Sequence, residues 1–225
     1  MDRDSARRRL DALVHRYQES VAATGRDPGL TARVRSLADY QSQRLAATYA
    51  DLRRQPRYGP AVEFFLADLY GPQDMRERDQ QVLRALDKLK RFLPAAALRA
   101  LAGAFEVHVL TIELDAATAT RLRSADPIDD DAYAAAYRAA GRRQDRDRQI
   151  TLIGEIGTLL DSLAQRPEVG LAIRLARGPA HAAGYGQLQD FLERGYDAFR
   201  KLDGAREFLA AIDGRERELM QRLLD

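Results

Sequence analysis

The residues of this sequence best suited to hold a metal ion are Glu106 and His108, followed by Glu113 and Asp115. Helical bundles bind dinuclear metal centres with Glu-x-x-His pairs, because that spacing puts both ligands on one helical face. Glu106 and His108 are only two residues apart, which turns their side chains roughly 200° away from each other. The sequence contains no Glu-x-x-His, so we expect no bound metal and no other cofactor.

Other catalytic patterns are also absent from the sequence. There is no Gly-x-Ser-x-Gly, no glycine-rich phosphate loop with a lysine and no zinc-protease histidine pair. The absence of cysteine excludes disulfides, thiolate metal sites and cysteine nucleophiles. His15, His108 and His181 could each ligate a haem, but a lone histidine is usually structural. We therefore predict no catalytic residue and favour a protein that is not an enzyme.

The most distinctive stretch runs from Pro56 to Asp74 and concentrates aromatic residues and prolines. Gly59-Pro60 begins a short helix in it and Gly71-Pro72 ends that helix. One interpretation is a core helix held between two turns; the other is a binding site. The candidate interaction or pocket residues are Arg57, Tyr58, Phe64, Asp68, Tyr70, Arg78 and Asp79.

The charged residues around this helix have a purely structural interpretation as well. Arg57, Arg78 and Arg148 could form buried ion pairs with acidic residues around the aromatic helix. The planar guanidinium group suits bidentate pairing with a carboxylate such as Asp68 or Asp79. We prefer this interpretation for these charges.

Apolar residues recur at helical spacing along the chain, and no segment alternates with the period of a strand. The pattern predicts an all-α bundle of nine or ten helices in a single domain, residues 1–225, which could divide into two sub-bundles near 124–131. One helix is expected over 168–176, ending at Gly178-Pro179, and another over 182–202. Aspartates 129–131 suit a helix N-terminus, and 94–122 is expected to be the central helix.

Several motifs resemble an uncharacterised bacterial family named for a Phe-Phe-Leu-Glu-Glu-Leu-Tyr (FFLEELY) motif. They are 57–58, 64–72, 78–79, 141–150, 177–180 and 189–195. Ala67 and Asp68 stand where the motif has two glutamates. The resemblance covers about residues 30–225, and because the family has no assigned activity, cofactor or catalytic residue, it implies no function.

The net charge of +2 argues against a broad basic surface for nucleic acid. No signal peptide and no window apolar enough to cross a membrane is found, so a cytoplasmic location is expected. We expect a non-catalytic binding or protein-interaction module, with a protein partner or a homodimer. The alternative is an enzyme or a cofactor- or metal-binding bundle that uses the central helix around Glu106 and His108.

Overall fold

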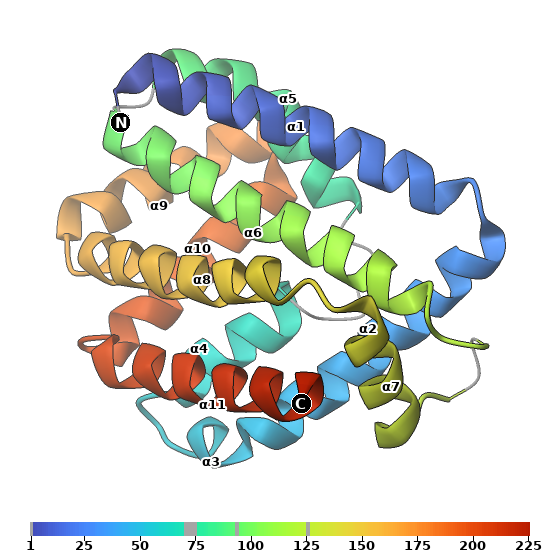
Figure 1. Ribbon diagram of the computed structural model, residues 1–225. Helices are drawn as coiled ribbons and strands as arrows, with labels where there is room; N and C mark the ends of the chain where they lie inside the picture. Colours follow the sequence, from blue (N-terminus) through green and yellow to red (C-terminus); the bar gives the residue numbers. More distant parts are fainter. Residues whose placement is uncertain (1, 70–75, 93–94, 125–126) are drawn as a thin grey trace. The chain divides into compact units, whose positions relative to one another are not determined.

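The chain is all-α in the part that the computed structural model describes, residues 2–69, 76–92, 95–124 and 127–225. The side chains of residues 69, 76–79, 87–89, 92, 96 and 97 lie outside the described set. Eleven α-helices and one π-helical turn follow one another without a strand in this part of the chain (Figure 1). The all-α prediction is confirmed, with more helices than the nine or ten expected.

The chain divides into two compact units. Unit 1 comprises Met1–Gln41, Pro94–Ile156 and Ala210–Asp225, and unit 2 comprises Ser42–Leu93 and Gly157–Leu209. Residues 124–131, where the sequence predicts a division, lie inside unit 1. The prediction of a single domain stays a prediction.

Unit 1 is organised around α6. Its helices are α1 (Arg3–Gly25), the first part of α2 (Pro28–Thr48), α6 (Ala95–Ala119), α7 (Asp130–Ala140), and parts of α8 (Arg143–Ala164) and α11 (Arg206–Leu224). One apolar core cluster of this unit comprises Leu37, Ala119, Leu122, Tyr133, Ala136, Tyr137, Ile150, Met220 and Leu223, and another comprises Leu110, Leu114 and Leu152. Helix α1 lies along α6 in Figure 1, and residues from both helices are in contact.

The N-terminus of α7 is where the acidic run predicted one. The Asp129 carboxylate accepts a hydrogen bond from the N–H of Ala132 at 2.8 Å, which satisfies one free donor of the first turn. Asp130 and Asp131 follow in that turn, where the helix dipole favours negative charge. The prediction for these aspartates is confirmed.

Unit 2 contains α3 (Ala50–Arg53), α4 (Gly59–Phe64), the π-helical turn η1 (Phe65–Leu69), α5 (Arg76–Phe92), α9 (Pro167–Ala182) and α10 (Gly186–Leu202). The stretch predicted as one short helix is therefore α-helical only through Phe64, and it continues as a π turn. Gly71-Pro72, its predicted end, lies outside the described residues.

Helix α9 is longer than predicted. We expected it to end at Gly178-Pro179, yet it continues through Pro179 to Ala182. Proline removes one hydrogen bond from a helix but does not forbid the last turn, and this turn is held because the Ala183 N–H donates to the Pro179 carbonyl at 3.0 Å. As a consequence, α10 begins at Gly186 rather than near Ala182.

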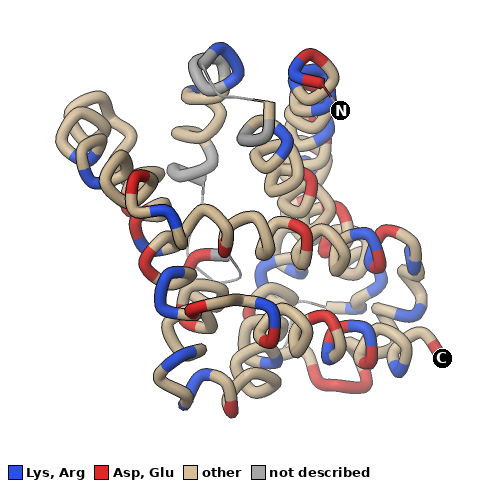
Figure 2. The backbone as a smooth tube through the Cα atoms, turned by 90° about the vertical axis from the view of Figure 1, so that its left-hand side faces the viewer, with Lys and Arg blue, Asp and Glu red and all other residues tan. Residues whose placement is uncertain are grey.

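Basic and acidic residues are interleaved along the helices rather than separated onto different ones (Figure 2). This distribution agrees with the nearly balanced charge of the sequence, 36 basic against 34 acidic residues. Among the described residues, no helix combines the length and the apolar character that a bilayer crossing needs.

Candidate functional site

Arg57 lies in the turn between α3 and α4, and its guanidinium binds the end of α10. The Nε atom donates to the Leu202 carbonyl at 2.6 Å, and Nη2 donates to the carbonyls of Asp203 and Gly204 at 3.2 and 3.0 Å. These carbonyls lie at a helix C-terminus, where acceptors lack partners within the helix. Arg57 therefore caps α10, a structural task that occupies most of its donors.

Tyr58 extends the same contact to α11. Its hydroxyl donates to the Glu207 carboxylate at 2.7 Å, and Arg57 Nη1 reaches that carboxylate at 3.1 Å. The hydrogen bond from Tyr58, with the Arg57 charge, lowers the pKa of Glu207, and the same bond raises the pKa of Tyr58. The Tyr58 ring stacks on Phe208 with centroids 5.9 Å apart. The predicted site residues Arg57 and Tyr58 thus lie together, and both bind Glu207 of the same chain.

Phe64 belongs to the core of unit 2. Only 6% of it is exposed, and its ring lies 5.3 Å from that of Phe191 between centroids. A Cβ atom added to Gly195 would come within 2.9 Å of the Phe64 ring. Helix α10 can approach this ring closely only because residue 195 is a glycine, so Phe64 has the packing role that the structural interpretation gives it.

Asp68 lies in the π turn and pairs with an arginine. Arg194 of α10 contacts it in a bidentate manner, with Nη2–Oδ1 at 2.6 Å and Nε–Oδ2 at 3.2 Å, and the Asp68 side chain is 12% exposed. Sequence reasoning anticipated bidentate pairing but considered other arginines as partners. Tyr70 and the side chains of Arg78 and Asp79 lie outside the described residues.

Glu106, on the central helix, is bound by two guanidinium groups. Arg9 of α1 forms an ion pair with it, and Arg148 Nε of α8 donates to its Oε1 at 3.2 Å. Burial raises the pKa of Glu106, but the two arginine hydrogen bonds outweigh burial and leave that pKa below its ordinary value. His108 instead stacks on Tyr17 with ring centroids 5.5 Å apart. This arrangement is that of a structural carboxylate and gives no support to the metal-binding alternative.

The two other acidic residues of α6 also have partners on neighbouring elements. Glu113 accepts from Arg16 at 2.9 Å and from Arg142 at 3.1 Å. Asp115 accepts from the Gln41 side-chain amide at 3.1 Å, and burial raises the pKa of Asp115 to about 6 despite this bond and the nearby Arg146 charge. No group of three or more metal-binding side chains is found among the described residues.

A hollow of about 340 Å³ lies between α8 and α11 in unit 1. It is lined by Arg143, Gln144, Asp147, Arg217, Met220 and Gln221. Arg217 pairs there with Asp147 and, through Nε at 3.0 Å, with Asp213. The charges around the hollow are therefore compensated within the chain, which leaves no excess field to attract a charged ligand.

The two most exposed leucines among the described residues lie on the outward side of α9. The sequence analysis did not single them out. Leu171 is 57% exposed and Leu175 69% exposed. Pro179 and Ala182, also exposed, continue the series at spacings of four and three residues, which places all four on one helical face. These four positions form the outer face of α9, Leu171–Leu175–Pro179–Ala182, and the exposed Glu168, three residues before Leu171, lies at its N-terminal end.

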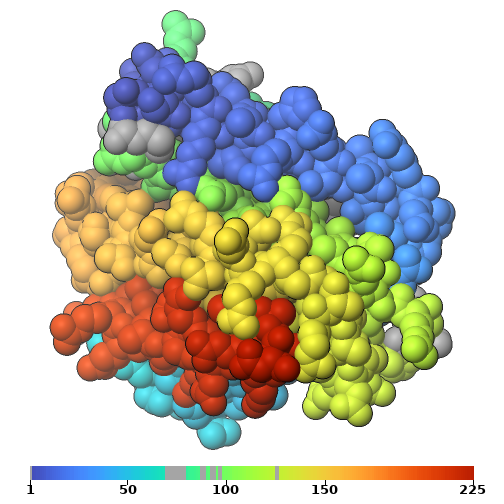
Figure 3. Space-filling view, in the orientation of Figure 1, coloured from blue at the N-terminus to red at the C-terminus, as the bar shows by residue number. Residues whose placement is uncertain are grey.

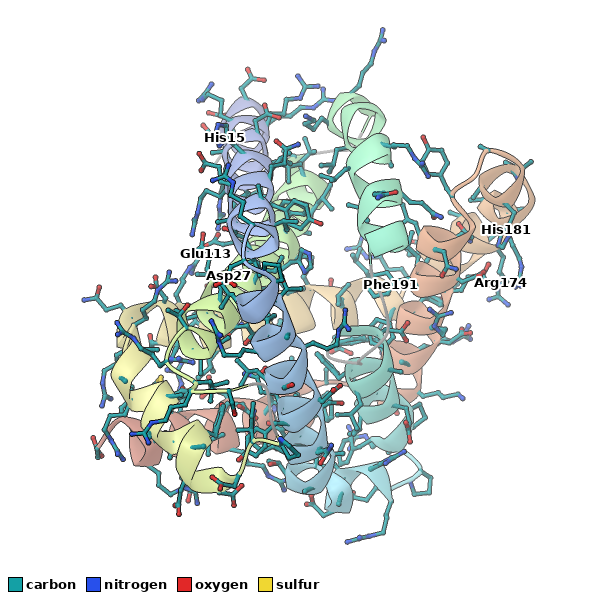
Figure 4. The ribbon with its side chains drawn as sticks, turned by 90° about the vertical axis from the view of Figure 1, so that its right-hand side faces the viewer. His15, Asp27, Glu113, Arg174, His181 and Phe191 are labelled. Carbon is teal, nitrogen blue, oxygen red and sulfur yellow. The ribbon has the colours of Figure 1, made fainter. Side chains whose placement is uncertain are left out.

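The opposite side of α9 is packed against α10. A Cβ atom added to Gly170 would lie 2.4 Å from the Tyr196 hydroxyl, and the Gln189 amide donates to the Ile173 carbonyl at 2.6 Å. Two side-chain contacts reinforce the hairpin: an Arg177–Glu193 ion pair at 2.8 Å and a His181–Asp190 hydrogen bond at 3.0 Å. Figure 4 shows Arg174 and His181 on α9 and Phe191 on α10. Helix α9 thus has apolar residues on both sides, of which only one is covered by α10.

A longer predicted α9 would have revealed this face. Because the sequence prediction ended the helix at Gly178-Pro179, Pro179 and Ala182 were not placed in register with Leu171 and Leu175. When the helix extends to Ala182, it has more apolar residues than a single buried face can hold. These additional apolar residues are the sequence feature that indicates a second, outer apolar face.

The described helices define an all-α protein. Residues 20–225 match the model of a family described as a domain of unknown function (DUF8198). The chain therefore belongs to that family. A search of curated proteins and a search of solved structures each found no match.

Proposed function

We propose that this protein is a non-catalytic interaction module and that the outer face of α9 is the surface that binds a partner protein. The exposure of Leu171 and Leu175, one helical turn apart, is the observation that carries the proposal. Single exposed apolar residues are common on protein surfaces, whereas contiguous apolar patches mark interaction sites. The proposal extends to a cytoplasmic location, a bacterial origin and membership of the FFLEELY-type proteins, all of which stay predictions.

Burial of this face can contribute part of the free energy of recognition, and further contacts with the partner must supply the rest. Burying a leucine side chain stabilises a complex by about 1.5–3 kcal/mol relative to leaving it in water. Two leucines at 57% and 69% exposure therefore offer roughly 2–4 kcal/mol. Alanines and a proline beside them add contact area at little cost in side-chain entropy. A face of this kind suits a partner that presents its own apolar groove or helix.

The hairpin also holds the face in a fixed conformation. Arg177 forms an ion pair with α10, His181 forms a hydrogen bond with α10, and Gly170 allows a close approach of Tyr196. A preorganised helix loses little conformational entropy on binding, which favours affinity. The candidate residues Arg57, Tyr58, Phe64 and Asp68 have internal partners and support a structural role.

The test replaces both leucines with serine, Leu171→Ser and Leu175→Ser, in the full chain. Because both side chains are exposed, the free energy of unfolding should change by less than about 0.5 kcal/mol. Complexes recovered from the native host by cross-linking and quantitative mass spectrometry should lose their partner at least tenfold. The partner identified in this way distinguishes self-association from binding of another protein.

A matched control changes two other exposed apolar residues, Val21→Ser and Leu160→Ser, at 44% and 37% exposure. The control variant should keep the partner at the wild-type level. Equal loss of the partner in both variants would show that general surface hydrophobicity, rather than the outer face of α9, drives association. Full retention in the Leu171→Ser, Leu175→Ser variant would refute the proposal.

A further inference from the structure

Helices α1 and α6 run parallel and in a fixed register. Arg9 pairs with Glu106, and Arg16 pairs with Glu113; in both pairs the partners are 97 residues apart in the sequence. The arginines and the glutamates are each seven residues apart, close to two helical turns. Two ion pairs with the same offset fix both the direction and the register of α1 on α6.

The apolar side of α1 matches this register. Ala6, Leu10 and Leu13 are buried, at 0%, 0% and 4% exposure, and they recur at spacings of four and three residues. The Tyr17 ring continues the contact onto Phe105, 5.8 Å away between centroids. In the space-filling view, α1 in blue lies over α6 in green (Figure 3). Helix α1 therefore binds α6 as an amphipathic helix with one apolar stripe and two arginines.

The acceptors on α6 have a second partner in addition to α1. Arg148 holds Glu106 at 3.2 Å, and Arg142 holds Glu113 at 3.1 Å, both from the α8 side of unit 1. Because these contacts do not involve α1, the two carboxylates would keep their places if α1 left. The α6 face, defined by Phe105, Glu106, His108 and Glu113, is thus a preorganised receptor for guanidinium groups.

The region matched by the family model contains the α6 face but not most of α1. The family match begins at residue 20, so most of α1 lies outside it, whereas α6 and α8 lie entirely within it. The connection to α2 is short: the Asp27 carboxylate accepts from the Leu30 N–H at 3.0 Å, and the Thr31 hydroxyl donates to the Thr24 carbonyl at the end of α1 at 3.0 Å. A Cβ atom at Gly25, the last residue of α1, would meet nothing within 4 Å. Figure 4 shows His15 on α1 and Asp27 in this connection.

We propose that the α6 face is a helix-binding site of the family domain, which α1 fills within its own chain and which α1 of a second copy of this chain can fill in its place. The ligand is an amphipathic helix with two arginines seven residues apart beside an alanine–leucine stripe. Occupation by a second copy exchanges α1 between two chains, a common route to a dimer. This surface is separate from the outer face of α9, so either proposal can fail without the other.

The test uses a fluorescent synthetic peptide of residues 2–26 and the full chain carrying Arg9→Glu and Arg16→Glu. Charge reversal weakens the internal α1, so the α6 face becomes available to the wild-type peptide. Fluorescence anisotropy should show binding at least tenfold tighter than to the wild-type chain, in which α1 competes at high effective concentration. The milder variant Arg9→Gln, Arg16→Gln gives the same readout if reversal unfolds the chain.

Two controls isolate the register. A chain carrying Arg8→Glu and His15→Glu, which are also seven residues apart but exposed on α1, should bind the peptide no better than the wild-type chain. A peptide with Arg9→Glu and Arg16→Glu should not bind. The proposal would be overturned if the wild-type peptide bound neither the charge-reversed chain nor the glutamine variant. It would also be overturned if the charge-reversed peptide bound as well as the wild-type peptide.

Discussion

The guanidinium Nε of Arg57 donates to the carbonyl oxygen of Leu202 at 2.6 Å, across 145 residues of sequence. This contact joins the turn before α4 to the end of α10. The same side chain also reaches the two carbonyls that follow Leu202. A residue that looked in the sequence like part of a binding surface is therefore the cap of a distant helix.

Replacing Arg57 with alanine should destabilise the protein by about 1–3 kcal/mol, because charged hydrogen bonds to otherwise unpaired carbonyls are lost. Lysine should not restore the stability, since one ammonium group cannot span three carbonyls as a guanidinium does. The measurement is the free energy of unfolding in urea. Arg54→Ala, at an exposed position of the same segment, is the control and should stay within about 0.5 kcal/mol of the wild type.

Two glycines in helices should respond to alanine in opposite directions. At Gly195 the new Cβ would lie 2.9 Å from the buried Phe64 ring, so we expect a net loss of about 1–2 kcal/mol. At Gly214, an exposed position of α11, nothing lies within 4 Å, and the better helix propensity of alanine should add up to about 1 kcal/mol. Thermal unfolding of both variants compares them directly; a gain at Gly195 would disprove the close packing.

The helical architecture could be predicted from the sequence, because helical periodicity and caps such as Asp129 are local properties. It could not supply the partners of Asp68 or Glu106, which come from helices more than 40 residues away. Residue type indicated that arginines would pair with carboxylates, but the choice among 33 arginines and three lysines depends on packing in three dimensions.

The outer face of α9 escaped prediction for a different reason. Gly178-Pro179 is a common helix end, and taking it as the end of α9 hid the apolar series that runs through Pro179. The π turn after Phe64 could not be foreseen either, since its residues have ordinary helical periodicity. In both places the tertiary context overrides a local signal.

The pKa of Asp115 predicts a defined pH dependence of stability. Burial raises it from 3.8 in the unfolded chain to about 6 in the folded protein. Between these values the folded state holds a proton that the unfolded state has released, so the contribution of this group to stability falls as pH rises from about 4 to 6. Above pH 6 the loss amounts to at most about 3 kcal/mol.

The variant Asp115→Asn removes this titration and can still accept from the Gln41 amide. It should therefore be more stable than the wild type at pH 7, by about 1–3 kcal/mol, and nearly equal to it at pH 4. Urea unfolding at the two pH values measures the difference. Equal stabilities at pH 7 would show that the charged form of Asp115 is not penalised, since the Arg146 charge would then balance its burial.

Site-specific cross-linking shows directly whether a partner protein binds the outer face of α9. Because the chain has no cysteine, Leu175→Cys provides one attachment point for a photoactivatable cross-linker, and Arg222→Cys, at an exposed position of α11, provides the reference. In extracts of the native host, we expect one dominant protein adduct from position 175 and no such adduct from position 222. The substitution Leu171→Ser should abolish the adduct from position 175. The same adducts from both positions, or none from position 175, would contradict the binding of a partner at this face.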